Sequence, residues 1–427
     1  MLSSAFKIAL KIVGEYWWIL APVALFFIFK GLWLDYIQSK FINNLKWSVL
    51  EIKFPKEVKK TPKAMEQIFA GFHGTEGDPS FTEKWFKGEL PVWFSLEIIG
   101  GGGDIHFFIR TQEKFRNLVE AQVYAQYPDA EINEVEDYVT CLPPKIPSRE
   151  YDVWGTELVL AKEDAYPIRT YPYFFEEAGK EEERVDPLSS LSEVLNSVTP
   201  DEHIWIQILV SPTDDKWKEE AEKLIEKLIG KKVTRTPQGM MLEEVHGWAE
   251  ALRETLHEFF FGHSEEKSSF KEKEKSLESL MQFLTPGQKD VVTAIEKNIS
   301  KLGFKTLIRF IYWAKSDVFN SANKAAVIGS FKQFNTQNLN GFKPNKNIKP
   351  GAKFLFKNRR NFSRKLNLIS NYKKRSFPFR SFSSRGFIFN TEELASIYHV
   401  PGRFVEAEAL PRVEAKKKGP PSGLPTE

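Results

Sequence analysis

The hydrophobic pattern of the chain starts with one long apolar stretch. Tyr16–Leu34 (YWWILAPVALFFIFKGLWL) holds nineteen residues with a single charge, Lys30. At about 1.5 Å per residue, a helix of that length roughly matches the ~30 Å hydrocarbon core of a bilayer. Amphipathic rings at both ends are typical of the headgroup level. We therefore predict a transmembrane helix over 16–37, preceded by an interfacial amphipathic helix over 1–15 and anchored by Trp17, Trp18, Phe26, Phe27, Lys30, Trp33 and Tyr36.

The charges that flank this stretch predict its orientation. Lys7 and Lys11 precede it, whereas a longer series of lysines follows, beginning with Lys40, Lys46 and Lys53. Because positive flanks stay on the cytoplasmic side, we expect a single-pass protein of the cell membrane with its large C-terminal part in the cytoplasm. A buried core helix is the alternative interpretation. A cleaved signal peptide is disfavoured, because no small-x-small site follows the stretch.

The pattern changes to that of an α+β body after residue 45. Segments that alternate or run apolar as strands do are interleaved with segments whose apolar residues recur at helical spacing. Between 45 and 140 the strands are 47–54, 92–99, 105–110 and 130–138, and the helices are 61–72 and 111–126. This order, β-α-β-β-α-β, is the ferredoxin-like plan.

Residues 151–342 repeat this order around a charged helical insertion at 231–285. One segment in each half supports this repeat. The segment FKTLIRF is followed by a helix and then LNGF, just as HFFIRT is followed by a helix and then INEV. Arg309 and Arg110 occupy similar places in these two segments. We therefore predict an α+β protein in which a transmembrane helix precedes two ferredoxin-like α/β sandwich domains, 45–140 and 151–342.

Charge separates a third region from these domains. The formal net charge is only +3, but Phe342–Gly386 carries fourteen basic residues, no acidic ones, and several interleaved aromatic rings. We predict that 343–386 is a basic loop that contacts a polyanion, either anionic lipid or single-stranded nucleic acid, with a solvated loop as the alternative. The proposed contacts are Lys353, Lys357, Arg359, Arg360, Arg364, Lys373, Lys374 and Arg375.

A search for catalytic and ligand motifs favours a protein without enzymatic activity. The chain lacks the P-loop pattern, and Gly100–Gly103 joins two strands, as a hairpin turn does. His257 and His263 do not have the i, i+4 spacing of a helical zinc site, and the other histidines are scattered, with no paired carboxylate or cysteine nearby. The single cysteine, Cys141, excludes an intrachain disulfide and is interpreted as a small packing residue. We predict no catalytic residue, no cofactor and no metal site.

Two stretches resemble known families. Thr61–Gly74 and His106–Tyr138 (HFFIRTQEKFRNLVEAQVYAQYPDAEINEVEDY) resemble a family of bacterial membrane-anchored proteins of unknown function. Phe387–Gly402 (FIFNTEELASIYHVPG) and Leu410–Pro425 are similar to the segment that leads into the motor domain of conjugation-type (type IV secretion) ATPases, such as the coupling proteins. The resemblance implies a membrane anchor, α+β domains and a nearby P-loop motor.

The chain stops at Glu427, about where such a motor would begin, so the resemblance implies a P-loop ATPase on a separate chain. We predict a non-enzymatic, membrane-anchored scaffold of that machine. The prediction leaves open whether the scaffold forms oligomers. Residues 387–407 form a strand and a docking helix in this hypothesis, and 408–427 a disordered tail. Asn390 is the predicted N-cap, and the docking residues are Glu392, Glu393, Leu394, Ile397 and Tyr398.

Three alternatives remain open at this point. The docking helix can instead pack on its own domain, as any amphipathic helix does. The protein can also be a membrane-tethered nucleic-acid-binding protein that acts through 342–386. An enzyme of unrecognised type is a third interpretation, since catalytic residues distant in sequence meet only in the fold.

Overall fold

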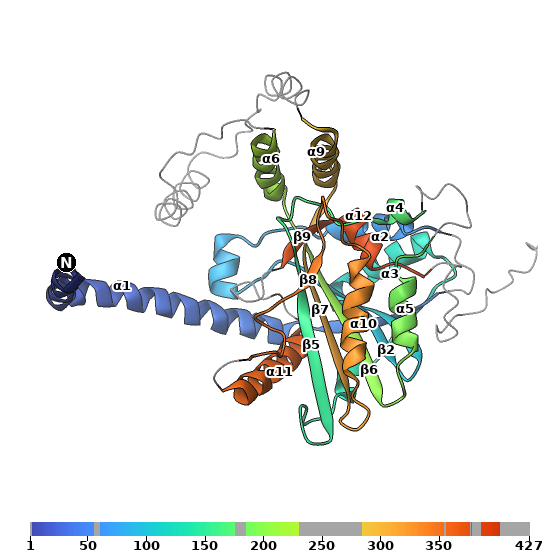
Figure 1. The fold of residues 1–427 in the computed structure, drawn as a ribbon, viewed down its shortest axis with the longest axis horizontal. Coiled ribbons are helices and arrows are strands. Elements are labelled where there is room, and N and C mark those ends of the chain that lie inside the picture. Colours follow the sequence, from blue (N-terminus) through green and yellow to red (C-terminus); the bar gives the residue numbers. More distant parts are fainter. Residues whose placement is uncertain are drawn as a thin grey trace, which may run out of the picture.

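One antiparallel sheet organises the body (Figure 1). The computed structural model describes residues 2–54, 60–175, 185–229, 284–353, 356–375, 377 and 386–401. The sheet has nine strands in the order β4-β1-β3-β2-β6-β7-β5-β8, and β9 pairs with β7. The strands are β1 (Trp47–Lys53), β2 (Phe94–Gly101), β3 (Asp104–Gln112), β4 (Glu131–Glu134), β5 (Tyr151–Leu160), β6 (Glu202–Pro212), β7 (Gly303–Lys315), β8 (Phe342–Pro344) and β9 (Phe387–Asn390).

The two halves of the sheet have the same internal strand order. The first half reads β4-β1-β3-β2, and the second reads β8-β5-β7-β6 when it is followed from its own outer edge. They join through β2 and β6, with Leu96 opposite Ile208 near the middle of the shared ladder. The predicted α+β class is confirmed, but the two predicted sandwiches share one continuous sheet instead of lying apart. Pairing of β2 with β6 removes two open strand edges, which would otherwise attract other chains.

One face of the sheet is covered by short helices. In Figure 1 two of them, α5 and α10, lie in front of the strands. Met65, Ile68, Phe69 and Phe72 recur at helical spacing on α2, and all four are buried in the main core, as the sequence pattern predicts. The helices of this layer are α2 (Lys63–His73), α3 (Arg116–Gln126), α4 (Tyr171–Phe175), α5 (Ser189–Asn196), α10 (Ser321–Lys332) and α12 (Thr391–Ile397).

The opposite face is covered by α11 (Lys357–Lys374) and the turn η3 (Tyr138–Cys141). Leu368, Ile369 and Tyr372 pack on the sheet, and Leu368 lies over Gly155, where an added Cβ would meet its Cδ2 at 2.7 Å. The prediction of a basic loop over 343–386 is therefore corrected, since this region contains β8 and a helix of 18 residues. The many charges of this segment favoured the prediction of a loop, although Leu368, Ile369 and Tyr372 form an apolar face on the helix.

A separate helical pair stands at one end of the sheet. α6 (Lys216–Leu228) and α9 (Pro286–Ile299) pack through their own apolar cluster (Figure 1). α9 starts with a capping box formed by Thr285 and Gln288. Nearly all of the predicted insertion at 231–285, and the whole predicted tail at 408–427, lie outside the described residues.

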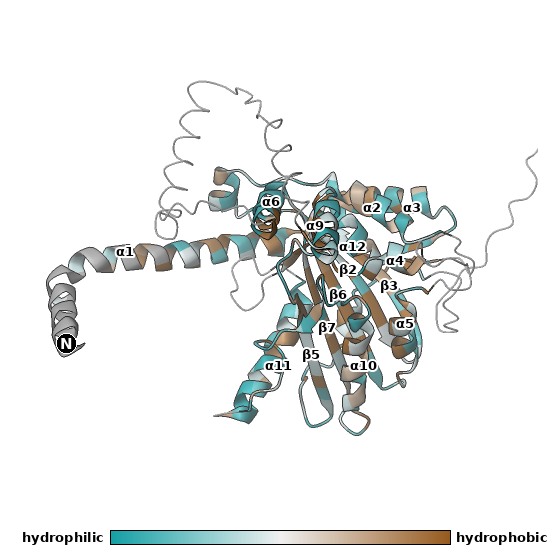
Figure 2. Cartoon of the chain, turned by 45° about the horizontal axis from the view of Figure 1, so that its top comes forward, coloured by the Kyte–Doolittle hydropathy of each residue, from teal (hydrophilic) through white to brown (hydrophobic). Residues whose placement is uncertain are grey.

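The N-terminal helix α1 (Leu2–Asn44) extends away from the body (Figures 1 and 2). It is one helix of 43 residues, so the predicted boundary between 1–15 and 16–37 does not interrupt it. Within the part of the chain that the structure describes, no helix has both the length and the apolar character needed to cross a bilayer, which corrects the prediction of a transmembrane helix over 16–37.

Candidate functional site

The C-terminal third of α1 is held by the body. Leu34 and Ile37 are buried, and the indole nitrogen of Trp33 donates a hydrogen bond of 2.9 Å to the carbonyl oxygen of Trp85. Trp85 belongs to the short turn η1 (Glu83–Lys87), and the ammonium of Lys30 lies 5.2 Å from the centre of its ring. The predicted anchor residues Lys30 and Trp33 therefore contact the protein itself, which corrects their assignment to a lipid-facing belt.

A glycine makes this contact close. Gly88, directly after η1, has a φ of 71°, a left-handed conformation that favours glycine. A Cβ at this position would lie 2.5 Å from the carbonyl oxygen of Ile37. The backbone of this turn thus approaches the backbone of α1 directly, and the junction is built from both segments.

The preceding part of α1 exposes large apolar side chains. Leu25, Phe26, Ile28, Phe29 and Leu32 are 54–65% exposed, and Trp18 is 61% exposed. In Figure 2 hydrophobic residues occur along this outlying part of α1. Exposed apolar surface of this kind marks contact with a membrane or a partner protein. The side chains of Trp17 and Phe27 lie outside the described residues, and Tyr36 is exposed beside the body.

Most of the predicted polyanion contacts lie on the surface of α11 or close to it. The exposed ones are Lys353, Lys357, Arg359, Arg360, Lys373 and Lys374. Arg364 is half-buried and donates a hydrogen bond of 2.9 Å to the carbonyl oxygen of Lys349. The helix thus gathers the exposed cations on a structured surface, not on a loop.

Arg375 is the exception, and its predicted role is wrong. It ends α11 with a φ of 46°, is 0% exposed, and donates to both carboxylate oxygens of Glu97 at 2.6 and 2.9 Å and to Asp137 at 2.5 Å. Burial by itself would lower the pKa of Arg375, but the charge of Glu97 and the bonds to both acids raise that pKa above its ordinary value. Arg375 is therefore a structural ion-pair residue of the interior.

This ion pair continues as a polar row across four strands. Glu157, Arg309, Gln207 and Glu97 stand directly opposite one another on β5, β7, β6 and β2. Arg309 donates to Glu157 at 2.7 Å and to Gln207 at 2.9 Å, and the amide of Gln207 donates to Glu97 at 3.3 Å. All four are essentially inaccessible to solvent. Buried charges need partners of this kind, and a row of them penalises any other strand register.

The sequence contains little trace of this row. The residues that contact each other are far apart in the chain. The separation is 110 residues for Gln207 and Glu97, 152 for Arg309 and Glu157, and 278 for Arg375 and Glu97. The one usable signal was the similar placement of Arg110 and Arg309 in the two echoing segments.

The predicted docking helix α12 is buried inside the body. Asn390 caps it as predicted, since its side chain accepts a hydrogen bond from the backbone nitrogen of Glu393 at 2.8 Å. However, Leu394, Ile397 and Tyr398 are at most 1% exposed and belong to the main core. The predicted contact face is therefore covered by α2 and the sheet, which corresponds to the alternative interpretation that this helix packs on its own domain.

The two acidic residues of α12 are also occupied internally. Glu392 accepts hydrogen bonds from Thr170 and from Lys301, both at 2.5 Å. Glu393 accepts from the backbone nitrogens of Ile168 and Asn390 at 3.0 and 3.1 Å. Burial raises the pKa of Glu393 to about 8, and it raises the pKa of the nearby Asp164 to about 6.

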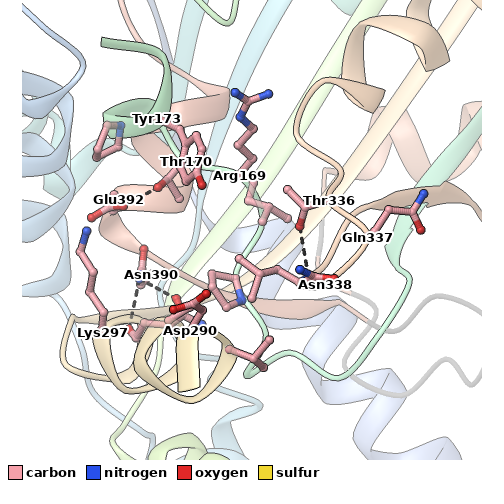
Figure 3. A pocket seen from close by; sticks show the side chains of 17 residues that line it. Arg169, Thr170, Tyr173, Asp290, Lys297, Thr336, Gln337, Asn338, Asn390 and Glu392 are labelled. Carbon is pink, nitrogen blue, oxygen red and sulfur yellow. Dashed lines mark hydrogen bonds between the residues drawn. The ribbon is translucent and has the colours of Figure 1, made fainter. Parts of the chain in front are cut away.

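A cavity of about 400 Å³ opens beside these residues, between α4, α9, α12 and the loop 336–339 (Figure 3). Asp290 and Lys297 line it from α9, and Arg169 stacks on the ring of Tyr173 at 4.9 Å. The Nε atom of Arg169 is buried and has no hydrogen-bond partner. The volume falls in the range of small-molecule sites. Sequence reasoning missed this cavity because its walls come from four distant segments.

The comparison with known families is decisive for classification. Residues 42–410 match the model described as Domain of unknown function (DUF8128). The chain belongs to this family. None of the curated proteins compared with the chain matches it. The DUF8128 match includes the whole sheet and begins near the end of α1, so most of α1 precedes it. It carries no link to secretion ATPases, which stays a prediction.

Within the DUF8128 body, two histidines have acidic partners that the sequence did not reveal. His106 lies 2.6 Å from Glu51, and the buried His399 lies 2.9 Å from Asp186. Cys141, expected to pack inside, is exposed. Over the described residues, no three His, Cys, Asp or Glu side chains are grouped as metal ligands, and His257 and His263 fall outside that part of the chain.

Proposed function

We propose that this protein is a non-enzymatic scaffold whose DUF8128 body is held at the cytoplasmic face of the cell membrane by α1. The observation that carries the proposal is the row of exposed apolar side chains, Leu25 to Leu32, on the part of α1 that leaves the body. Side chains of this size gain about 0.3–0.6 kcal/mol each on entering a bilayer. The buried Leu34 and Ile37 and the Trp33–Trp85 hydrogen bond connect that segment to the body.

Membrane fractionation of the full chain tests this attachment. The variant Ile28→Asp/Phe29→Asp places two charges on the outlying part of α1, where each costs about 2.5–3.5 kcal/mol in hydrocarbon. Its matched control, Ser39→Asp/Asn43→Asp, places the same charges on exposed positions of the same helix beside the body. We expect the first variant to leave the membrane fraction and the control to remain in it. A wild-type protein found entirely in the soluble lysate would contradict the proposal.

The proposed partner is a P-loop ATPase on a separate chain. This part rests on the resemblance of Phe387–Gly402 and Leu410–Pro425 to the segment ahead of secretion motors. Since α12 is an internal element, the contact is assigned to the chain after it. Deleting 402–427 keeps β9 and α12 in place, and we expect this deletion to abolish recovery of a P-loop ATPase in a pull-down from detergent-solubilised membranes. Unchanged recovery would exclude this contact.

A second candidate function is nucleic-acid binding by the membrane-tethered body. The observation in its favour is α11, where exposed Arg359 and Arg360 lie close to the exposed rings of Phe356 and Phe362. Cations that follow a backbone and rings on which bases stack are the usual means of binding single strands. A salt-sensitive mobility shift of a single-stranded oligonucleotide supports this function, and its absence at low salt removes it.

A further inference from the structure

We propose that Phe356 and the outer half of α11, up to Leu366, form a second membrane contact that binds anionic lipid headgroups beside α1. The inference rests on the proposed attachment through α1 and adds the chemical class of lipid that the body recognises.

The ends of α1 and α11 meet at one corner of the body. Ile42 and Leu45, at the end of α1, pack against a cluster that contains Trp93 and Phe377, and Phe377 follows α11 by three residues. From this corner both helices project to the same side of the body, α1 by its N-terminal part and α11 by its free end (Figures 1 and 2). A bilayer reached by α1 is therefore on the side to which α11 points.

The chemistry of α11 divides along its length. The inner half buries Leu368, Ile369 and Tyr372 on the sheet. At the middle of the helix, Lys365 forms an ion pair with Asp152. These contacts fix the inner half of the helix. The outer half, about 16 Å long at 1.5 Å per residue, contacts the preceding segment through Asn361 and Arg364 and exposes most of its other side chains.

The outer half presents cations together with apolar groups. Lys357, Arg359 and Arg360 are exposed, and none of the three forms an ion pair with a described residue. Phe356 is 77% exposed and Phe362 is 50% exposed. The helix contains no Asp or Glu. Basic residues attract anionic headgroups and rings settle at the headgroup level, so this combination fits an anionic bilayer surface.

A second exposed segment lies against α1. The turn η1 contacts Lys30 and Trp33 of α1 and exposes Phe86, at 72%, beside Lys84. Lys87 of the same turn lies 3.7 and 3.6 Å from Glu83 and Glu89, so η1 contributes rings more than charge. The charge recognition is therefore assigned to α11, and η1 adds an apolar contact next to α1.

Flotation of the full chain with lipid vesicles tests the assignment. The vesicles contain either phosphatidylcholine alone or phosphatidylcholine with 30% phosphatidylglycerol, a fraction chosen for the assay. The test variant is Lys357→Glu/Arg359→Glu/Arg360→Glu. The matched control, Lys223→Glu/Lys227→Glu/Lys289→Glu, reverses three exposed lysines on α6 and α9, away from α11. Both variants alter only exposed side chains, and thermal unfolding curves equal to that of the wild type verify that they fold.

We expect wild type and control to prefer the anionic vesicles. The α11 variant should lose at least about a hundredfold in partition coefficient on them, since each of the three cations contributes about 1 kcal/mol near such a surface and each introduced glutamate is repelled by it. Binding to neutral vesicles stays equal for all three proteins. Equal binding of the wild type to both vesicle types would overturn the inference and leave attachment by α1 intact. No binding to either type would reject the proposed function itself.

The same variants separate lipid from nucleic acid. A single-stranded oligonucleotide is added to the flotation assay at low salt. We expect it to leave binding to anionic vesicles unchanged. An oligonucleotide that binds the wild type but not the α11 variant, while both float equally with anionic vesicles, would overturn the lipid assignment in favour of the nucleic-acid function.

Discussion

The two halves of the sheet surround equivalent arginines with different partners. Arg110 on β3 and Arg309 on β7 occupy the third strand of their respective halves. Glu157 stands opposite Arg309, whereas Val49 stands opposite Arg110. The second half thus supplies an acid to its own arginine, and the first half does not. The same strand order can therefore hold an arginine with or without a facing carboxylate, depending on the residue at the facing position of the neighbouring strand.

The first half is completed by a residue from the far end of the chain. Arg110 lies 3.8 Å from the centre of the Trp47 ring, and its buried Nη1 has no hydrogen-bond partner. Burial, and then the nearby charge of Arg375, lower the pKa of Arg110 to about 10. The acid Glu97 pairs instead with Arg375. The first half consequently depends on α11, which follows the second half in the chain.

The largest expected effect comes from removing this link. Arg375→Met leaves the fully buried Glu97 without its bidentate partner, which costs about 3–5 kcal/mol of unfolding free energy. Urea unfolding followed by tryptophan fluorescence measures it. Lys374→Met, at the exposed neighbouring position, is the control, with an expected change within about 0.5 kcal/mol. Equal effects of the two substitutions would show that α11 does not secure the first half.

The equivalent arginines give the next largest contrast. Arg309→Met removes the buried cation that pairs with Glu157, so we expect a loss of about 3 kcal/mol in unfolding free energy. Arg110→Met removes a buried nitrogen that already lacks a partner and keeps an apolar contact with Trp47, so its loss is expected to be at most about 1 kcal/mol. The same urea titration compares both. A larger loss at Arg110 would reverse the comparison.

An acid introduced at position 49, opposite Arg110, tests the role of this facing position directly. Val49→Glu places a carboxylate opposite Arg110, as Glu157 is placed opposite Arg309. In a double-mutant cycle with Arg110→Met, we expect a favourable coupling of about 1–3 kcal/mol between the introduced carboxylate and the arginine. A coupling near zero would mean that facing strand positions alone do not explain how the halves differ.

The smallest effect concerns the layer that bridges the halves. α12 follows β9, which pairs with β7 of the second half, yet it packs on α2 of the first. Burial raises the pKa of Glu393 to about 8, above its ordinary 4.5, so the folded state retains a proton that the unfolded state releases. Stability contributed by this group is full below pH 4.5 and falls as pH rises toward 8, by up to about 1.4 kcal/mol per pH unit.

Glu393→Gln isolates this contribution, because the amide does not titrate. We expect the wild type to lose stability relative to the variant between about pH 6 and about pH 7, measured by urea unfolding at both values. A difference that stays constant with pH, or that grows in favour of the wild type as pH rises, would contradict the raised pKa.

Much of the local structure was predictable because its causes are local. The spacing of Met65, Ile68 and Phe72 places one apolar face on α2, and the predicted strand 92–99 overlaps the buried strand β2. Asn390 caps α12 because its own side chain reaches the backbone three residues on. The site regions were harder, since the wall of the cavity and the partners of Glu97 come from segments far apart in the chain.

The sequence by itself determined most of the helices and strands, their order along the chain, and the apolar and basic side chains that support the proposed membrane contacts, although the region of α11 was predicted as a loop. Only the tertiary structure decided that β2 pairs with β6, that Arg375 is an interior residue while Arg359 is exposed, and that α12 is covered. The physical reason is that periodicity and capping act over a few neighbouring residues. Pairing of strand edges and compensation of buried charges depend on groups brought together only when the whole chain folds.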